Sequence, residues 1–156
     1  MTDEDFLRVA MRAAREGIAA GQSPFGSVIV REGQVVSAAH NTVWHDTDPT
    51  AHAEVNNIRA VARILGTIHL AGCTLYSTCE PCPMCLAAIH WAKISRVVYG
   101  AGIADAAAAG FSELRVAARE LARMGGSPLV VEGGLLADEC RALFDEFRRL
   151  APGKSY

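Results

Sequence analysis

The sequence predicts an α/β fold of three layers, in which a five-stranded mixed sheet lies between helices on both of its faces. The first observation behind this prediction is the order of the elements, because apolar residues at helical spacing alternate with short β-branched runs as α-β-β-α-β-α-β-α-β-α. The second is the connections: strands joined by a tight turn should be antiparallel, and strands joined through helices should be parallel. The third is size, since 156 residues, of which 51% are apolar, are expected to form one compact domain over residues 1–156.

The expected elements follow one another with short connections. The strands are expected at 25–30, 34–39, 73–78, 95–101 and 128–134. The helices are expected from Thr2 or Asp3 to Gly21, through 55–65, and at 83–94, 104–109, 112–125 and 137–150. Glu32-Gly33 is typical of a hairpin turn. Gly66 ends the second helix, Pro83 suits the first turn of the third, and residues 41–50 are expected to form a polar loop.

Charge and composition exclude several classes of protein. The formal net charge is −2 without any basic block, which argues against a main role in binding nucleic acid. The acidic, amphipathic start of the chain is unlike a secretory signal, and no apolar run approaches the length of a membrane span. Five cysteines without a secretory signal indicate reduced thiols or metal ligands rather than disulfides. We therefore expect a soluble, cytoplasmic protein with no membrane partner.

Cys82 and Cys85 form a Cys-x-x-Cys pair at the start of the helix expected at 83–94. Alone, the pair is compatible with a redox dithiol, because this motif at a helix N-terminus lowers the pKa of a thiol. It is also compatible with a structural zinc knuckle, which needs four ligands. A closed site of that kind would have to recruit a further ligand from among Cys73, Cys79, Cys140 and a second histidine.

A third interpretation joins this pair to His52, which begins the segment His-Ala-Glu. One imidazole and two thiolates suit tetrahedral zinc and leave a fourth position open for water, as in catalytic sites. Two thiolates neutralise the charge of the ion, so a general base is needed beside it, and Glu54 is placed to be that base without binding the metal. His-x-Glu followed by Pro-Cys-x-x-Cys is the signature of zinc deaminases, which favours the catalytic interpretation.

With these motifs in place, the chain resembles the cytidine-deaminase-like superfamily, and within it the nucleobase deaminases. Four segments are similar to bacterial tRNA adenosine deaminases, namely "DPTAHAE", "LYST", "RVVYGA" and "EGGLLADEC". Other features look more like bacterial guanine deaminases and the related plant guanosine deaminases, namely "CEPCPMC", "AAIHWA", "DAAAAGF" and the final Tyr156. The resemblance covers nearly the whole chain and implies the family's five-stranded sheet between helices.

Three features favour the guanine deaminase branch. Cys79 precedes Glu80, where the tRNA enzymes carry a hydrophobic residue. The last helix stops at "RRLAPGKSY", where theirs continues into a basic segment that binds RNA. The "AGF" segment looks like the loop that supplies a recognition carboxylate for guanine, although this chain has Ser112-Glu113 where two aspartates are commoner. Glu113 can still accept hydrogen bonds from the amide and amino edge of guanine.

The resemblance implies a zinc-dependent aminohydrolase that converts guanine to xanthine and ammonia, with Glu54 as the proton carrier. Contacts with the substrate are expected from Phe25, Asn41, Ala53, Trp91, Glu113 and Tyr156. Structural alternatives stay open at these positions, since aromatic residues also pack in cores, an asparagine can serve a turn and a terminal tyrosine is often frayed.

Other substrates and another class of protein also stay open. The alternative substrates are cytosine, isocytosine, a triazine, guanosine and tRNA adenosine, and the alternative of another class is a non-catalytic zinc module. The resemblance further implies a homodimer in which the C-terminal segment crosses to the partner and brings Tyr156 to the other active site.

Overall fold

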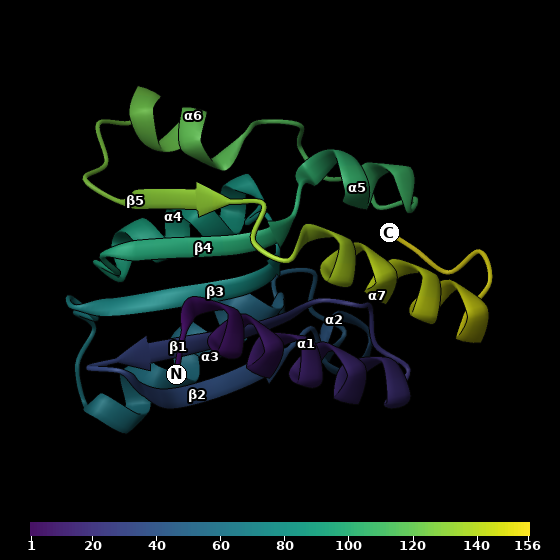
Figure 1. Ribbon diagram of the computed structural model, residues 1–156, viewed down its shortest axis with the longest axis horizontal. Helices are drawn as coiled ribbons and strands as arrows, with labels where there is room; N and C mark the ends of the chain where they lie inside the picture. The colour runs from purple at the N-terminus through teal and green to yellow at the C-terminus, as the bar shows by residue number, and fades with distance from the viewer.

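The computed structural model describes residues 1–156. Five strands form one sheet, with helices around it (Figure 1). The strands are β1 (Gly26–Arg31), β2 (Gln34–His40), β3 (Cys73–Cys79), β4 (Arg96–Ala101) and β5 (Val130–Gly133). The helices are α1 (Asp3–Ala19), α2 (Val43–Asp46), α3 (Ala53–Leu65), α4 (Pro83–Trp91), α5 (Ile103–Ala108), α6 (Ala118–Met124) and α7 (Ala137–Leu150). None of these helices combines the length and the apolar composition that crossing a membrane requires.

The sheet is mixed, as the sequence predicts. Its strand order is β2-β1-β3-β4-β5, in which β1 is antiparallel to both of its neighbours and β3, β4 and β5 are parallel. The hairpin between β1 and β2 turns at Glu32 and Gly33, whose φ angles of 51° and 72° are typical of a type I′ turn. Placing β1 between β2 and β3 needs contacts across the whole sheet, because no local pattern in the sequence specifies strand order.

Helices cover both faces of the sheet, and each face has its own apolar cluster. On one face, α1 and α7 pack over Val28, Tyr76 and Val98. On the other face, α3, α4 and α6 pack over a cluster that includes Ile29 and Leu75. Adjacent residues of β1 therefore belong to different clusters, as the two-residue period of a strand requires. The three-layer fold expected from the sequence is confirmed.

Three helix boundaries follow their local signals. The Thr2 hydroxyl accepts a hydrogen bond from the backbone N–H of Asp5 at 3.2 Å, and the Asp5 carboxylate accepts one from the N–H of Thr2 at 2.8 Å, which forms a capping box. Gly66 ends α3 in the left-handed conformation, with a φ of 64°. Pro83 is the first residue of α4.

Two irregular segments differ from what the sequence predicts. The polar loop 41–50 contains one turn of helix, α2. The helix expected at 112–125 begins only at Ala118, and the residues before it are neither helix nor strand. Tertiary contacts override helix propensity here, because Phe111 is buried in the cluster beneath α7 and the backbone N–H of Ala118 donates to the Glu80 carboxylate at 2.8 Å.

Candidate active site and metal centre

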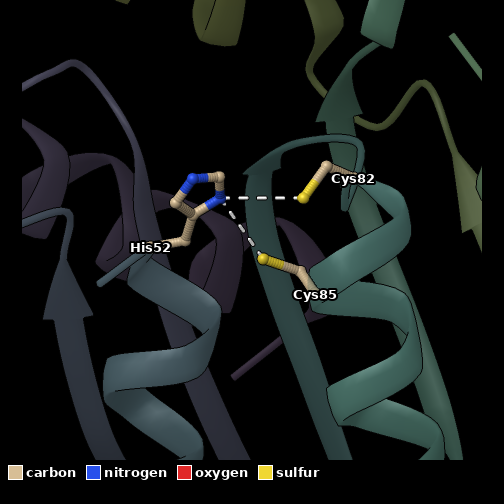
Figure 2. Close-up of side chains that lie close together, drawn as sticks. All are labelled: His52, Cys82 and Cys85. Atoms are coloured by element: carbon tan, nitrogen blue, oxygen red, sulfur yellow. Dashed lines mark hydrogen bonds between the residues drawn. The ribbon is translucent and has the colours of Figure 1, made fainter. Parts of the chain in front are cut away.

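The three residues expected to bind metal meet where α3 and α4 begin. His52 is the residue just before α3, Cys82 is the residue just before α4, and Cys85 lies in the first turn of α4. Figure 2 shows the His52 imidazole reaching across from one helix toward the two sulfurs of the other. The N-terminus of a helix carries partial positive charge, so both helices favour anionic groups at this point.

The donor atoms are spaced as a tetrahedral zinc ion requires. His52 Nδ1 is 3.7 Å from Cys82 Sγ and 3.4 Å from Cys85 Sγ. At the usual bond lengths, tetrahedral zinc holds a nitrogen and a sulfur about 3.6 Å apart. The three donor atoms lie within 4.8 Å of one another, and no fourth His, Cys, Asp or Glu belongs to the group. The residues therefore fit a zinc ion with one position left open, rather than a closed site of four protein ligands.

The two cysteines differ in their protonation. Hydrogen bonds from Cys85 and His52 lower the pKa of the Cys82 thiol to about 4, against the effect of burial. The same bond to Cys82, together with burial, raises the pKa of Cys85 well above its usual range. The lowered pKa favours the thiolate of Cys82 at neutral pH. The thiolate is the form of cysteine that binds a metal.

Glu54 lies in the first turn of α3 and is only 6% exposed. Its Oε1 accepts a hydrogen bond from the Ser77 hydroxyl of β3 at 3.1 Å, and its Oε2 accepts one from the Cys85 thiol at 3.5 Å. Burial raises the pKa of the Glu54 carboxyl above its ordinary value. A carboxyl with a raised pKa can hold and release a proton, so this arrangement places a proton carrier beside the metal-binding sulfurs.

Buried hydrogen bonds hold the start of α3 against the sheet. Ser27 of β1 donates to the backbone carbonyl of Ala53 at 2.9 Å, and Asn57 of α3 donates to Ser27 Oγ at 3.1 Å. Ala53 itself is fully buried. Since Ala53 stands between His52 and Glu54 in the chain, these bonds hold the backbone of both functional residues in place.

A pocket of about 230 Å³ opens beside His52 and Cys82. It is lined by Pro49, His52, Cys82, Pro83, Met84, Ser112, Glu113, Leu114 and Tyr156. Pockets for drug-sized ligands measure about 300–1,000 Å³, so this one suits a smaller compound such as a single ring system. Its lining combines the starts of α3 and α4 with the segment after α5 and with the C-terminal segment.

Glu113 brings a carboxyl group to the pocket, and one of its oxygens has no partner. Its Oε2 is buried and has no hydrogen-bond partner in the protein. Burial, and then the negative charge of Cys82, raise the pKa of Glu113 to about 8. Buried polar atoms are usually paired, so an orphan oxygen at the edge of a pocket indicates that a ligand supplies the missing donor.

Tyr156 lies against the same pocket and ties the C-terminal segment to it. Its hydroxyl is 3.1 Å from Ser23 Oγ and accepts a hydrogen bond from the Asn41 amide at 2.6 Å. Its ring packs edge-on against Trp44 and Phe111. Burial raises the pKa of Tyr156 to about 12, so the hydroxyl keeps its proton at neutral pH. In the single chain this segment lies on the chain's own pocket.

The two aromatic residues expected to stack on a substrate lie in different places. Phe25 packs edge-on against Phe111, with ring centroids 5.0 Å apart, and is not among the residues that line the pocket. Trp91 is 76% exposed and lines a separate groove between α4 and α6, beside Leu121. The structure does not bring Trp91 to the metal site, because Trp91 and Cys82 lie at opposite ends of α4.

Three polar residues near the site were not expected from the sequence. Ser77 holds the Glu54 carboxylate, Ser23 contacts the Tyr156 hydroxyl, and Glu80 accepts two backbone hydrogen bonds. All three are buried. The sequence carries no clear local signal for these roles, because their burial and their partners come from the tertiary fold.

A mixed α/β sheet that carries a His-Cys-Cys donor set and an adjacent buried carboxyl is typical of the zinc deaminases of nucleobases. The family model of the "Cytidine and deoxycytidylate deaminase zinc-binding region" matches residues 1–101. The chain belongs to this family, and it is a deaminase that uses zinc as its cofactor.

Known relatives add detail to this assignment. The guanine deaminase of Bacillus subtilis (strain 168) is 49% identical over 114 residues, which are 72% of this chain and 73% of that protein. The tRNA-specific adenosine deaminase of Aquifex aeolicus is 46% identical over 101 residues, which are 65% of this chain and 67% of that protein. A solved structure of the guanine deaminase from Nitrosomonas europaea matches with a TM-score of 0.85 and 27% identity, covering 94% of this chain and 84% of that one. The chain thus resembles guanine deaminases in sequence and in fold.

Proposed function

We propose that this enzyme hydrolyses guanine to xanthine and ammonia, and that it acts on the free base. The observation that carries the proposal is the orphan oxygen of Glu113 at the edge of the pocket beside His52 and Cys82. The five free cysteines agree with a reducing compartment, so we place the enzyme in the cytoplasm.

The chemistry of Glu113 favours guanine among the common bases. Guanine presents a ring N–H and an amino group on adjacent atoms, and a carboxylate can accept hydrogen bonds from both. Adenine and cytosine present a ring nitrogen that accepts hydrogen bonds beside the amino group, which opposes a carboxylate. Two N–H donors on the ligand would also stabilise the charged form of Glu113, which lacks donors in the protein.

The metal ligands and the proton carrier act at one point of the pocket. His52, Cys82 and Cys85 would hold the zinc ion, which supplies the Lewis acidity that makes water a nucleophile at neutral pH. The Glu54 carboxylate takes a proton from the attacking water and delivers it to a ring nitrogen of the base. It then takes a second proton from the hydroxyl that has been added to the carbon and delivers it to the amino group, which leaves as ammonia. Ser77 orients this carboxyl through its bond to Oε1.

Asn41 is fully buried next to the Tyr156 hydroxyl, and its proposed contact with the base would use one remaining amide hydrogen. Its side-chain oxygen accepts a bond from the N–H of Val43 at 3.0 Å, and one of its two amide hydrogens goes to Tyr156. The other amide hydrogen is free to meet a carbonyl oxygen of the base. Tyr156 would then act as a wall of the pocket and as a clamp on the Asn41 amide.

A second candidate is deamination of adenosine in tRNA, and the 46% identity to the Aquifex aeolicus enzyme favours it. Ammonia release from purified enzyme with guanine, adenine, cytosine, guanosine and tRNA separates the two. We expect guanine to be the fastest substrate, with a rate that is insensitive to salt. A faster reaction on tRNA that falls steeply as salt rises would favour the second candidate, because RNA binding releases counterions.

We further propose that two copies associate. The supporting observation is that Trp91 and Met124 expose 76% and 68% of their surface beside the groove between α4 and α6. If the C-terminal segments exchange in the dimer, Tyr156 would make the same contacts with the other copy. Light scattering at enzyme concentrations used in the assay tests the association.

A further inference from the structure

Glu80 joins the loop that carries the metal ligands to two helices that lie later in the chain. It stands two residues before Cys82, and it is 7% exposed. Its Oε2 accepts a hydrogen bond from the backbone N–H of Ile103 at 2.9 Å, and its Oε1 accepts one from the N–H of Ala118 at 2.8 Å. Since Ile103 and Ala118 are the first residues of α5 and α6, one carboxylate caps both helices.

Both helices need this acceptor, because the first N–H groups of a helix have no partner within it. The residue before α6 is Ala117, which has no side chain that can cap. Ala118 is 1% exposed, so without Glu80 its N–H would be buried with no acceptor. A carboxylate between two helix N-termini is also favoured by their partial positive charges.

The segment between the two capped helices carries Glu113. From Phe111 to Ala117 it has no helix or strand, and the Oε2 of Glu113 has no partner that could anchor the side chain. The backbone N–H of Ser112 donates to the carbonyl of Tyr156 at 2.8 Å. The position of Glu113 therefore depends mainly on where the ends of this segment are held.

Glu80 is itself held on the sheet. Its backbone N–H donates to the carbonyl of Ala101, the last residue of β4, at 2.8 Å. The same residue thus contacts the sheet, the start of α5 and the residue that directly follows the segment carrying Glu113, while it belongs to the metal loop.

We propose that Glu80 is a positioning residue that fixes Glu113 relative to the metal ligands and thereby sets the selectivity for the base. This inference rests on the proposed role of Glu113. The inference goes beyond the role of Glu113, because it states that Glu80, a residue outside the pocket, sets the distance between the reacting site and the group that recognises the ring.

The variant Glu80→Gln tests the proposal, because it keeps the shape of the side chain but has only one acceptor oxygen. We expect zinc bound at the wild-type ratio, a KM for guanine raised about tenfold and kcat changed less than about threefold, as fits the loss of one charge-assisted hydrogen bond. In a Glu113→Ala background, the same substitution should change kcat/KM less than about twofold. Additive effects in this double-mutant cycle would overturn the proposal.

Asp105→Ala is the matched control. Asp105 also caps α5, since its carboxylate accepts a hydrogen bond from the N–H of Gly102 at 2.8 Å, but it bonds to neither Ala118 nor the metal loop. Loss of this cap should lower thermal stability and leave the KM for guanine unchanged. A rise in KM equal to that of Glu80→Gln would show that capping α5 alone explains the effect, and would overturn the proposal.

Hydrogen exchange provides a measurement that needs no substrate. We expect the amides of residues 110–118 to exchange faster in Glu80→Gln than in the wild type, and to be unchanged in Asp105→Ala. If Glu80→Gln does not fold, Glu80→Asp, whose shorter side chain cannot span both helices, takes its place. Failure of the wild type to deaminate guanine would refute only the proposed function, whereas unchanged exchange or loss of zinc in the folded variant would refute the positioning role.

Discussion

The parts of the chain before and after residue 101 contribute to the site in different ways. Residues 1–101, which match the family model, present the His-Cys-Cys set and Glu54 at the starts of two regular helices that pack on the sheet. Residues 102–156 bring Glu113 and Tyr156 to the same pocket from segments without regular structure. We infer that the first part supplies the chemistry of deamination and that the second part selects the base.

The physical difference between the two parts is how their side chains are held. Glu54 is held by the Ser77 hydroxyl through its Oε1, and its Oε2 lies 3.5 Å from Cys85 Sγ. Glu113 lacks a partner for one oxygen, and Tyr156 depends on contacts with Ser23, Asn41 and the aromatic rings around it. Substitution of Glu54 or of a metal ligand in the first part should therefore abolish turnover, whereas substitution of Glu113 in the second part should change which base is used.

Removal of zinc should have the largest effect. Dialysis of the native enzyme against a chelator is expected to abolish ammonia release, and added zinc should restore it, because the source of Lewis acidity is lost and regained. Metal analysis and circular dichroism on the same samples check the cause. Full activity in protein with less than about one-tenth of its zinc would contradict the inference that residues 1–101 supply the chemistry of deamination through a zinc ion.

Glu54→Gln should come next. We expect kcat to fall about 10²- to 10⁴-fold, the usual contribution of general acid–base catalysis, while zinc content is unchanged. Ser77→Ala is the matched control, since it removes only the hydrogen bond to Glu54 Oε1, and should reduce kcat much less. Comparable losses in the two variants would mean that orientation, rather than proton transfer, is what Glu54 provides.

Glu113→Ala tests the second part. The kcat/KM for guanine should fall about 10- to 100-fold, as when a charge-assisted hydrogen bond to a ligand is lost, with zinc content unchanged. Discrimination between guanine and adenine should fall by a similar factor. The idea that this part selects the base fails if adenine is affected as strongly as guanine.

Tyr156→Phe should have a smaller effect. It keeps the ring against Trp44 and Phe111 and removes only the hydroxyl that contacts Ser23 and accepts from Asn41. The KM for guanine is expected to rise about two- to tenfold, because the Asn41 amide loses one partner that orients it. An unchanged KM in steady-state assays would show that the Tyr156 hydroxyl does not orient the Asn41 amide for binding.

Asp3→Asn should have the smallest effect, and it tests an ion pair of the first part whose arginine also pairs with a residue of the second part. Arg96 of β4 pairs with Asp3 at 2.7 Å and also with Glu132 of β5. The bond with Arg96 lowers the pKa of Asp3 below its ordinary 3.8, so its stabilising effect is present above that pH and is lost as the pH falls through the lower folded value. The pair is partly exposed, so we expect at most about 1 kcal/mol between wild type and variant near pH 7.

Thermal unfolding from pH 7 down to pH 3 measures this contribution. The difference in Tm between wild type and Asp3→Asn should be constant above about pH 5 and should shrink below about pH 4. A difference that grows at low pH would have the wrong sign for a carboxyl whose pKa is lowered in the folded state.

Helix and strand positions and the metal-ligand set were accessible from the sequence, because their signals are local. The capping box at Thr2, the turn at Glu32-Gly33 and the stop at Gly66 each depend on a few neighbouring residues. The motifs around His52 and Cys82 predict ligands because few other chemistries need those residue types at that spacing. The helix expected at 112–125 was too long, because long-range bonds to Glu80 and burial of Phe111 outweigh its propensity.

The substrate contacts were harder to predict from the sequence, because they depend on contacts between residues that lie far apart in the chain. The expectation for Trp91 used only its place after the metal-binding cysteines, and a helix of nine residues carries it to the other end of α4. Phe25 was open between core and pocket, and it packs on Phe111 and does not line the pocket.

The sequence by itself determined the succession of helices and strands and the class of the sheet, and it predicted the three metal ligands and the proton carrier, because these depend on local periodicity and on donor chemistry. Only the tertiary structure decided the strand order, the meeting of Glu113 and Tyr156 at one pocket, and the capping of two helices by Glu80. These features join residues far apart in the chain, and such contacts form only when packing of the whole core compensates the entropy of closing the loops between them.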